Sequence, residues 1–88
     1  MPRYIIERNV GSITPQELEA ASRRSIAVIG EMDGVIWIKS YVSHAEGKIY
    51  CEYDAPDERA IREHARRAGL PVDKISEVAL EISPAMFH

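Results

Sequence analysis

Residues 35–55 read VIWIKSYVSHAEGKIYCEYDA and contain the pattern that decides the fold. Residues 35–43 alternate in polarity and are rich in β-forming side chains. Residues 44–47 can turn the chain, and residues 48–55 have the composition of a returning strand. The stretch therefore predicts a β-hairpin.

The segment before the hairpin predicts a helix. Thr14, Pro15 and Glu17 have the order of a capping box with proline at the first helical position. Gly30 and the pair at 33–34 are expected to end this helix. The positions that recur at helical spacing, and that should face the core, are Leu18, Ala21, Ser22, Ser25, Val28 and Ile29.

The segments after the hairpin and at the two ends complete the pattern. A second helix should open at Pro56 and Asp57 and end at Gly69. Residues 3–9 and 74–83 have the composition of strands. The order is β-α-β-β-α-β, which predicts a single α+β domain over 1–88 of the ferredoxin-like type. Both helices should cover one face of a four-stranded antiparallel sheet.

A hairpin loop of even length places facing residues of its two strands on the same side of the sheet. One side would then be the more aliphatic and should lie under the helices: Ile38, Ser40, Val42, Ile49, Cys51 and Tyr53. The other would stay open: Trp37, Lys39, Tyr41, Ser43, Lys48, Tyr50 and Glu52. An open face bearing Trp37, Tyr41 and Tyr50 predicts a homodimer, packed sheet to sheet as an α/β sandwich or barrel. The alternative is an aromatic surface without a partner.

Composition narrows the classes of function. The chain has 88 residues, a net charge of −3 and only short basic runs, so we expect no nucleic-acid partner. No stretch has the length of a signal peptide's apolar region or of a membrane span, so we expect no membrane association and a cytoplasmic location. Cys51 is the only cysteine, which excludes an intrachain disulfide.

His64 is the main candidate for a functional site, because it occupies an otherwise apolar helix face with Ala60, Ile61, Ala65 and Ala68. That face should lie over Cys51 and Tyr53. An imidazole and a thiolate, with a carboxylate from Glu7 or Glu77, have the chemistry to bind a divalent metal. The other interpretation is structural: a hydrogen-bonded core histidine, a small buried cysteine and two ion-paired glutamates.

Three functions stay open on these residues. The first is a small binding protein, with a metal or organic ligand beside His64 in a pocket that includes Tyr53 and Ser40. The second is an enzyme without a cofactor, an oxygenase or isomerase in which His64 acts as general base and Tyr53 or Glu7 orients the substrate. The third is a dimeric interaction module without a ligand.

Three stretches carry a resemblance that spans nearly the whole chain: RYIIERN at 3–9, residues 35–56, and AIREHARRAGLPVDKISEV at 60–78. The chain resembles a family of small bacterial domains of unknown function, some of whose members are labelled nickel-binding proteins. The resemblance implies a ferredoxin-like dimer and a nickel site. In the nickel-binding members a second histidine follows the one that matches His64, and a third precedes the last-strand glutamate. Here Ala68 and Ser76 occupy those positions.

Overall fold

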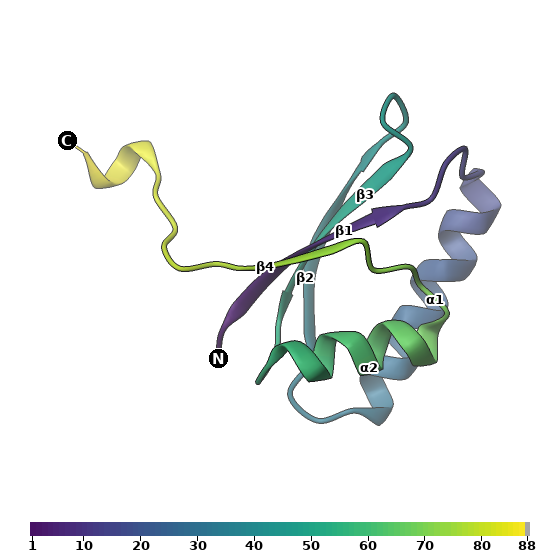
Figure 1. The fold of residues 1–88 in the computed structure, drawn as a ribbon, viewed down its shortest axis with the longest axis horizontal. Coiled ribbons are helices and arrows are strands. Elements are labelled where there is room, and N and C mark those ends of the chain that lie inside the picture. Colours follow the sequence, from purple (N-terminus) through teal and green to yellow (C-terminus); the bar gives the residue numbers. More distant parts are fainter. Residues whose placement is uncertain (88) are drawn as a thin grey trace.

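A computed structural model describes residues 1–87 and has the predicted order of elements (Figure 1). The strands pair into one antiparallel four-stranded sheet in the order β2-β3-β1-β4, which confirms the ferredoxin-like α+β fold. Within residues 1–87, no helix is long and apolar enough to cross a membrane. The bounds are β1 Arg3–Asn9, α1 Pro15–Glu31, β2 Ile36–Ser43, β3 Lys48–Asp54, α2 Glu58–Ala68 and β4 Lys74–Glu77.

The helix ends follow the local signals in the sequence. At the start of α1, Glu17 N donates to Thr14 Oγ1 at 3.1 Å and Thr14 N donates to Glu17 Oε1 at 3.0 Å, which completes the capping box. The helix continues through Gly30 and ends one residue later. Asp57 caps the start of α2, and Gly69 ends it in the left-handed conformation at φ +67°.

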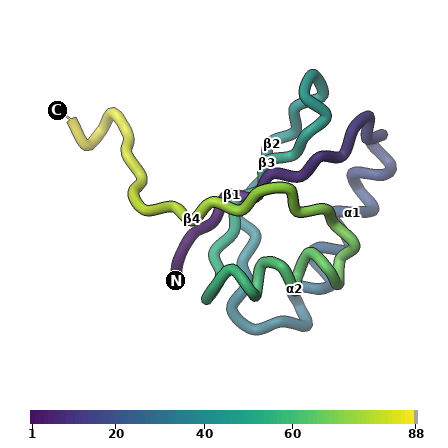
Figure 2. Tube along the Cα trace, viewed as in Figure 1, coloured from purple at the N-terminus to yellow at the C-terminus, as the bar shows by residue number. Residues whose placement is uncertain are grey.

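The last strand is shorter than the sequence predicted. A strand was expected over 74–83, but β4 ends at Glu77. Val78 N still donates to Arg3 O at 2.8 Å, and β1 offers no strand residue before Arg3. Residues 79–87, the C-terminal arm, therefore leave the sheet and extend away from the body of the protein (Figures 1 and 2).

The core lies between the helices and one face of the sheet. In β1 the buried positions alternate, so that Tyr4, Ile6 and Arg8 face the helices while Ile5 and Glu7 face the other way. Strand pairing places Tyr53 opposite Tyr4 and Cys51 opposite Ile6. The buried apolar cluster consists of Tyr4, Ile6, Val35, Ile49, Cys51, Tyr53, Ala55 and Ile61.

An irregularity in β2 places Trp37 and Ile38 on the sides of the sheet opposite to those predicted. The register between β2 and β3 shifts between Trp37 and Lys39, so that Trp37 pairs with Tyr53 and Ile38 has no partner residue. Trp37 thus lies on the helix side, in contrast to the expectation that it lies on the open face. Ile38, expected under the helices, is 40% exposed. Downstream of the bulge the predicted partition holds: Ser40 pairs with Cys51, Val42 with Ile49 and Tyr41 with Tyr50.

Candidate functional site

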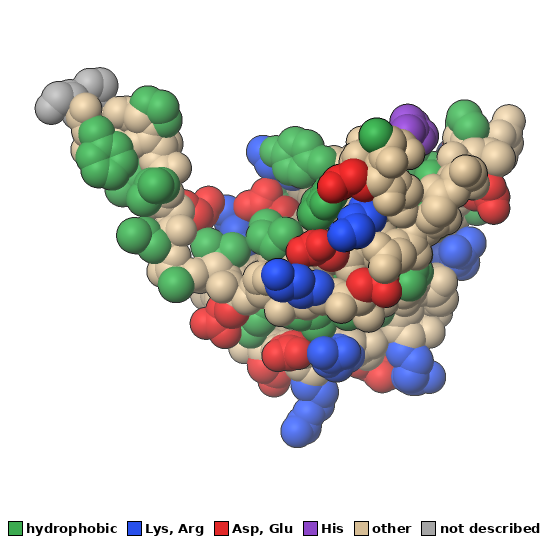
Figure 3. Space-filling view, turned by 45° about the horizontal axis from the view of Figure 1, so that its top comes forward, with side chains coloured by type: hydrophobic (Ala, Val, Ile, Leu, Met, Phe, Trp, Pro, Cys, Tyr) green, Lys and Arg blue, Asp and Glu red, His purple; other side chains and the backbone are tan. Residues whose placement is uncertain are grey.

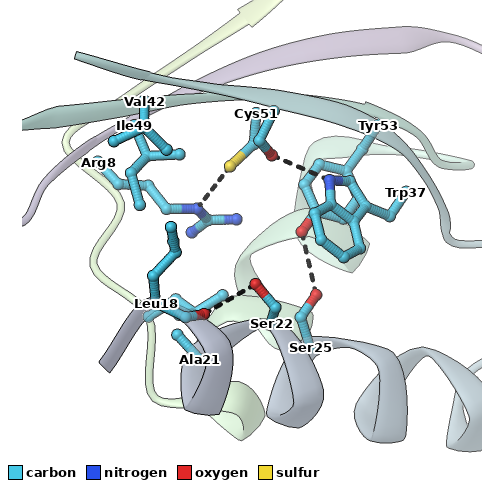
Figure 4. A pocket seen from close by; sticks show the side chains of 12 residues that line it. Arg8, Leu18, Ala21, Ser22, Ser25, Trp37, Val42, Ile49, Cys51 and Tyr53 are labelled. Carbon is cyan, nitrogen blue, oxygen red and sulfur yellow. Dashed lines mark hydrogen bonds between the residues drawn. The ribbon is translucent and has the colours of Figure 1, made fainter. Parts of the chain in front are cut away.

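A pocket of about 210 Å³ lies between α1 and the helix-facing side of the sheet (Figure 4). It is bounded by α1, by all three of β1, β2 and β3, and by the segment that follows α2. The lining is largely apolar, with one charged side chain and a few hydroxyl groups. It consists of Arg8, Leu18, Ala21, Ser22, Ser25, Trp37, Ser40, Val42, Ile49, Cys51, Tyr53 and Leu70.

Small side chains on both walls account for the pocket. On α1, Ala21, Ser22 and Ser25 face the sheet where a tightly packed helix would carry larger residues. On the sheet, Ser40 and Cys51 are directly opposite each other across β2 and β3. Protein interiors are normally filled to the density of organic crystals. Short side chains on both facing walls leave space that neither wall fills.

A chain of hydrogen bonds at one end of the pocket links three elements. His64, in α2, is fully buried, and its Nε2 lies 3.1 Å from Ser25 Oγ in α1. Ser25 Oγ lies 3.2 Å from the Tyr53 hydroxyl in β3 (Figure 4). The rings of His64 and Tyr53 also contact each other, with their centroids 5.2 Å apart. Ser25 therefore connects the buried imidazole to the pocket.

The surroundings of His64 favour its neutral form. Burial lowers the pKa of His64, a hydrogen bond with the backbone of Ser25 acts in the opposite direction, and the positive charge of Arg8 lowers the pKa further. Burial likewise raises the pKa of Tyr53, although Ser25 and Arg8 partly oppose the rise. At neutral pH both groups are therefore uncharged and act as hydrogen-bonding groups.

Arg8 is the charged residue of the pocket, and it is only 1% exposed. Its Nε donates to Cys51 Sγ at 3.4 Å, and its Nη1 donates to the carbonyl oxygen of Pro71 at 2.8 Å. The guanidinium carbon lies 5.9 Å from the centre of the Tyr53 ring. Nη2 is buried and has no hydrogen-bond partner within residues 1–87. Figure 4 shows the guanidinium directed between the sheet and α1.

The structure separates the four residues predicted to bind a metal. Cys51 and His64 lie on the helix side, but Glu7 lies on the open face, where its carboxylate is 3.5 Å from Lys48 Nζ. Glu77 is exposed at the edge of the sheet, opposite Tyr4. Among the described residues no group of three or more His, Cys, Asp or Glu side chains is placed to hold a metal ion. Among residues 1–87, these four side chains are therefore not placed to bind one metal ion together.

The predicted pocket residues are brought together, with additions. Ser40 and Tyr53 both line the pocket, and Trp37 Nε1 donates to Ser40 Oγ at 2.9 Å. Arg8 was not among the residues that the sequence predicted for the pocket. Alternation along β1 could have placed Arg8 on the side of the helices. Because Ile5 and Ile6 are both apolar, however, the sequence does not show which face of the strand is buried.

A family model and a crystal structure both match this chain over most of its length. Residues 4–78 match the model of a family described as nickel responsive protein SCO4226-like. The structure is similar to the crystal structure of SCO4226 from Streptomyces coelicolor A3(2), with 28% sequence identity and a TM-score of 0.81. The match covers 91% of this chain and 99% of that one. A search of curated proteins gave no significant match.

Proposed function

The chain belongs to the nickel-responsive SCO4226-like family, and we propose that it is a binding protein for a small ligand held between α1 and the sheet. The observation that carries this proposal is the pocket of about 210 Å³. Its apolar lining and its few converging polar groups, Arg8, Ser25 and Tyr53, are typical of small-molecule sites. We place this function in the cytoplasm, because Cys51 is a buried free thiol rather than half of a disulfide.

Nickel does not suit this pocket. The Sγ of Cys51 accepts a hydrogen bond from Arg8, and His64 does not line the pocket, which it approaches only through Ser25. The buried guanidinium of Arg8 would also repel a dication. Although the family is described as nickel responsive, we therefore assign no nickel ligand among these residues. A titration with Ni²⁺ of the wild type and of His64→Ala tests this: a stoichiometric heat that disappears in the variant would contradict it.

The enzymatic alternative has less support. A general base must reach the proton that it removes, directly or through one water. His64 does not line the pocket and approaches it only through Ser25. Glu7, the other proposed participant, lies on the opposite face of the sheet. The geometry therefore favours binding over catalysis.

Trp37 provides a direct measurement of binding. It is the only tryptophan and it lines the pocket, so a bound ligand should change its fluorescence. We expect saturable changes with some members of a panel of small neutral and anionic aromatic compounds. Ser22→Leu should fill the pocket and weaken binding, while Ala27→Leu, at an exposed position of the same helix, should leave binding unchanged.

Two results would contradict the proposal. One is that no compound in the panel changes the fluorescence of Trp37. The other is that Ser22→Leu, shown by circular dichroism to be folded, binds as tightly as the wild type.

We further propose that the chain forms a homodimer. The open sheet face carries Tyr41, which is 59% exposed, together with Tyr50. The strongest support is the C-terminal arm, where apolar side chains stand clear of the body (Figure 3). Apolar surface of this kind is normally covered by a partner, and a second copy is the simplest one. Four large apolar side chains of the arm are at least half exposed: Leu80, Ile82, Met86 and Phe87.

Sedimentation equilibrium tests the dimer. We expect twice the chain mass at micromolar concentration. Replacing Leu80 and Ile82 together with serine should weaken association, while Ser83→Ala in the same arm should not. A monomeric mass for the wild type at micromolar concentration would rule the dimer out.

A further inference from the structure

We propose that the ligand of this pocket is a small carboxylic acid with an apolar, preferably aromatic body, and that Arg8 binds its carboxylate. This inference rests on the proposed function and specifies the chemistry of its ligand. It depends on three features: a buried cation without a counter-ion, a second donor on a side chain close to that cation, and the size and apolar character of the pocket.

The first feature is the unbalanced charge of Arg8. Burial of a charged side chain is costly unless the charge is paired. Arg8 is 1% exposed, and its two hydrogen bonds go to the sulfur of Cys51 and the carbonyl of Pro71, neither of which is a carboxylate. None of the residues that line the pocket is acidic. An anionic ligand would supply the missing counter-charge.

The free donors of Arg8 suit a carboxylate. A guanidinium has five N–H donors. One on Nε is used by Cys51 and one on Nη1 by Pro71, so three remain, two of them on the unpartnered Nη2. Neighbouring N–H groups of a guanidinium lie side by side in one plane. This is the arrangement in which arginine binds both oxygens of a carboxylate.

The second feature is a donor supplied by Tyr53. His64 is neutral, and its Nδ1 is buried without a partner. Because orphaned buried N–H groups are rare, the proton of the ring is assigned to Nε2, which then donates to Ser25. Ser25 in turn donates to the oxygen of Tyr53. This order leaves the Tyr53 hydroxyl proton free to donate to a ligand in the pocket.

The third feature is the volume and the apolar character of the space. A dry cavity of about 150 Å³ holds a benzene molecule. The pocket measures about 210 Å³, which leaves room for a carboxylate on such a ring. Trp37 and Leu18 provide apolar walls from β2 and α1. Inorganic phosphate suits this lining less well, because it would fill the apolar part of the pocket with oxygens that have no donors.

The test uses benzoate as the probe, with benzamide as its uncharged analogue and inorganic phosphate as a second anion. Dissociation constants are measured from the fluorescence of Trp37 at fixed ionic strength. We expect benzoate to bind at least tenfold more tightly than benzamide, and phosphate not to compete with it. Arg8→Met should weaken benzoate binding by roughly tenfold to a hundredfold, the range for loss of a charge-assisted hydrogen bond.

Two further variants keep the test decisive. Arg8→Lys retains the charge but not the fork, and should lose less affinity than Arg8→Met. Arg62→Met removes an exposed arginine of α2 and should leave benzoate binding unchanged. Circular dichroism establishes that each variant is folded. If Arg8→Met does not fold, the comparison of benzoate with benzamide on the wild type and on Arg8→Lys decides the question.

The outcomes separate the two proposals. Equal binding of benzoate and benzamide would overturn the role of Arg8 and leave the pocket a binding site. Binding of phosphate in preference to benzoate would overturn the choice of a carboxylate. An absence of binding by every compound of the panel would overturn both this inference and the proposed function.

Discussion

Replacing Ser25 with alanine should destabilise the fold far more than the loss of one hydroxyl on a helix usually does. Ser25 is 3% exposed, and its Oγ connects His64 Nε2 and the Tyr53 hydroxyl. Alanine removes the partner of both groups at once. Because Tyr53 lines the pocket, water can replace Ser25 as its partner. His64 is fully buried and out of reach of solvent, so the cost falls mainly on the imidazole.

The size of the effect follows from the burial of His64. A buried polar group left without a hydrogen bond costs about 1–3 kcal/mol, and we take about 2 kcal/mol for Ser25→Ala. For a domain of this size, 1 kcal/mol corresponds to about 4–8 °C in the melting temperature. The variant should therefore melt roughly 8–16 °C below the wild type.

Ser22→Ala is the matched control, since it removes the same hydroxyl one turn earlier on α1. Ser22 also lines the pocket, but its Oγ donates only to Leu18 O of its own helix, at 2.8 Å. Its loss should change the free energy of unfolding by no more than about 0.5 kcal/mol. Thermal and urea unfolding followed by circular dichroism measure both variants. If Ser25→Ala is no less stable than Ser22→Ala, the hydrogen bonds of Ser25 to His64 and Tyr53 do not stabilise the fold.

Two further predictions concern stability. Folding lowers the pKa of His64, so that below about pH 6.5 the unfolded chain binds a proton that the folded chain does not. The free energy of unfolding should therefore fall as the pH drops below about 6.5, and level off below the folded-state pKa. Urea unfolding between pH 7.5 and 5 should show this fall in the wild type and in the exposed-site control His44→Gln, but not in His64→Gln; a fall of equal size in His64→Gln would contradict the assignment. Gly69→Ala should lower the free energy of unfolding by about 1 kcal/mol, because Gly69 has φ +67°. Gly30→Ala should raise it by about 0.5–1 kcal/mol, because Gly30 lies inside α1 and no atom is within 4 Å of the added Cβ. Thermal melts that show the two glycine variants changing stability in the same direction would refute this explanation.

Local chemistry in the sequence was sufficient to predict the elements and their order. The capping box at Thr14 and Glu17, the cap at Asp57 and the stop at Gly69 act within a few residues, and each is found in the structure. The end of β4 could not be predicted in this way. Residues 78–83 have the composition of a strand, but β1 begins at Arg3 and offers no further partner.

The contents of the pocket required the tertiary structure. The sequence placed Cys51, Tyr53 and Ser40 together and put His64 above them, because alternation and helical spacing are regular. It placed Trp37 on the wrong face, because it assumed unbroken alternation, whereas the register of β2 against β3 shifts between Trp37 and Lys39.

Arg8 marks the limit of sequence reasoning for this protein. By itself the sequence determined a β-α-β-β-α-β fold with His64 on the core side of its second helix. Only the tertiary structure decided that Glu7 faces away and that Arg8 is buried in the pocket. The physical reason is that a shift of one residue in strand register exchanges the two faces. That register is set by the neighbouring strands, β3 and β4, which lie far from β1 along the chain.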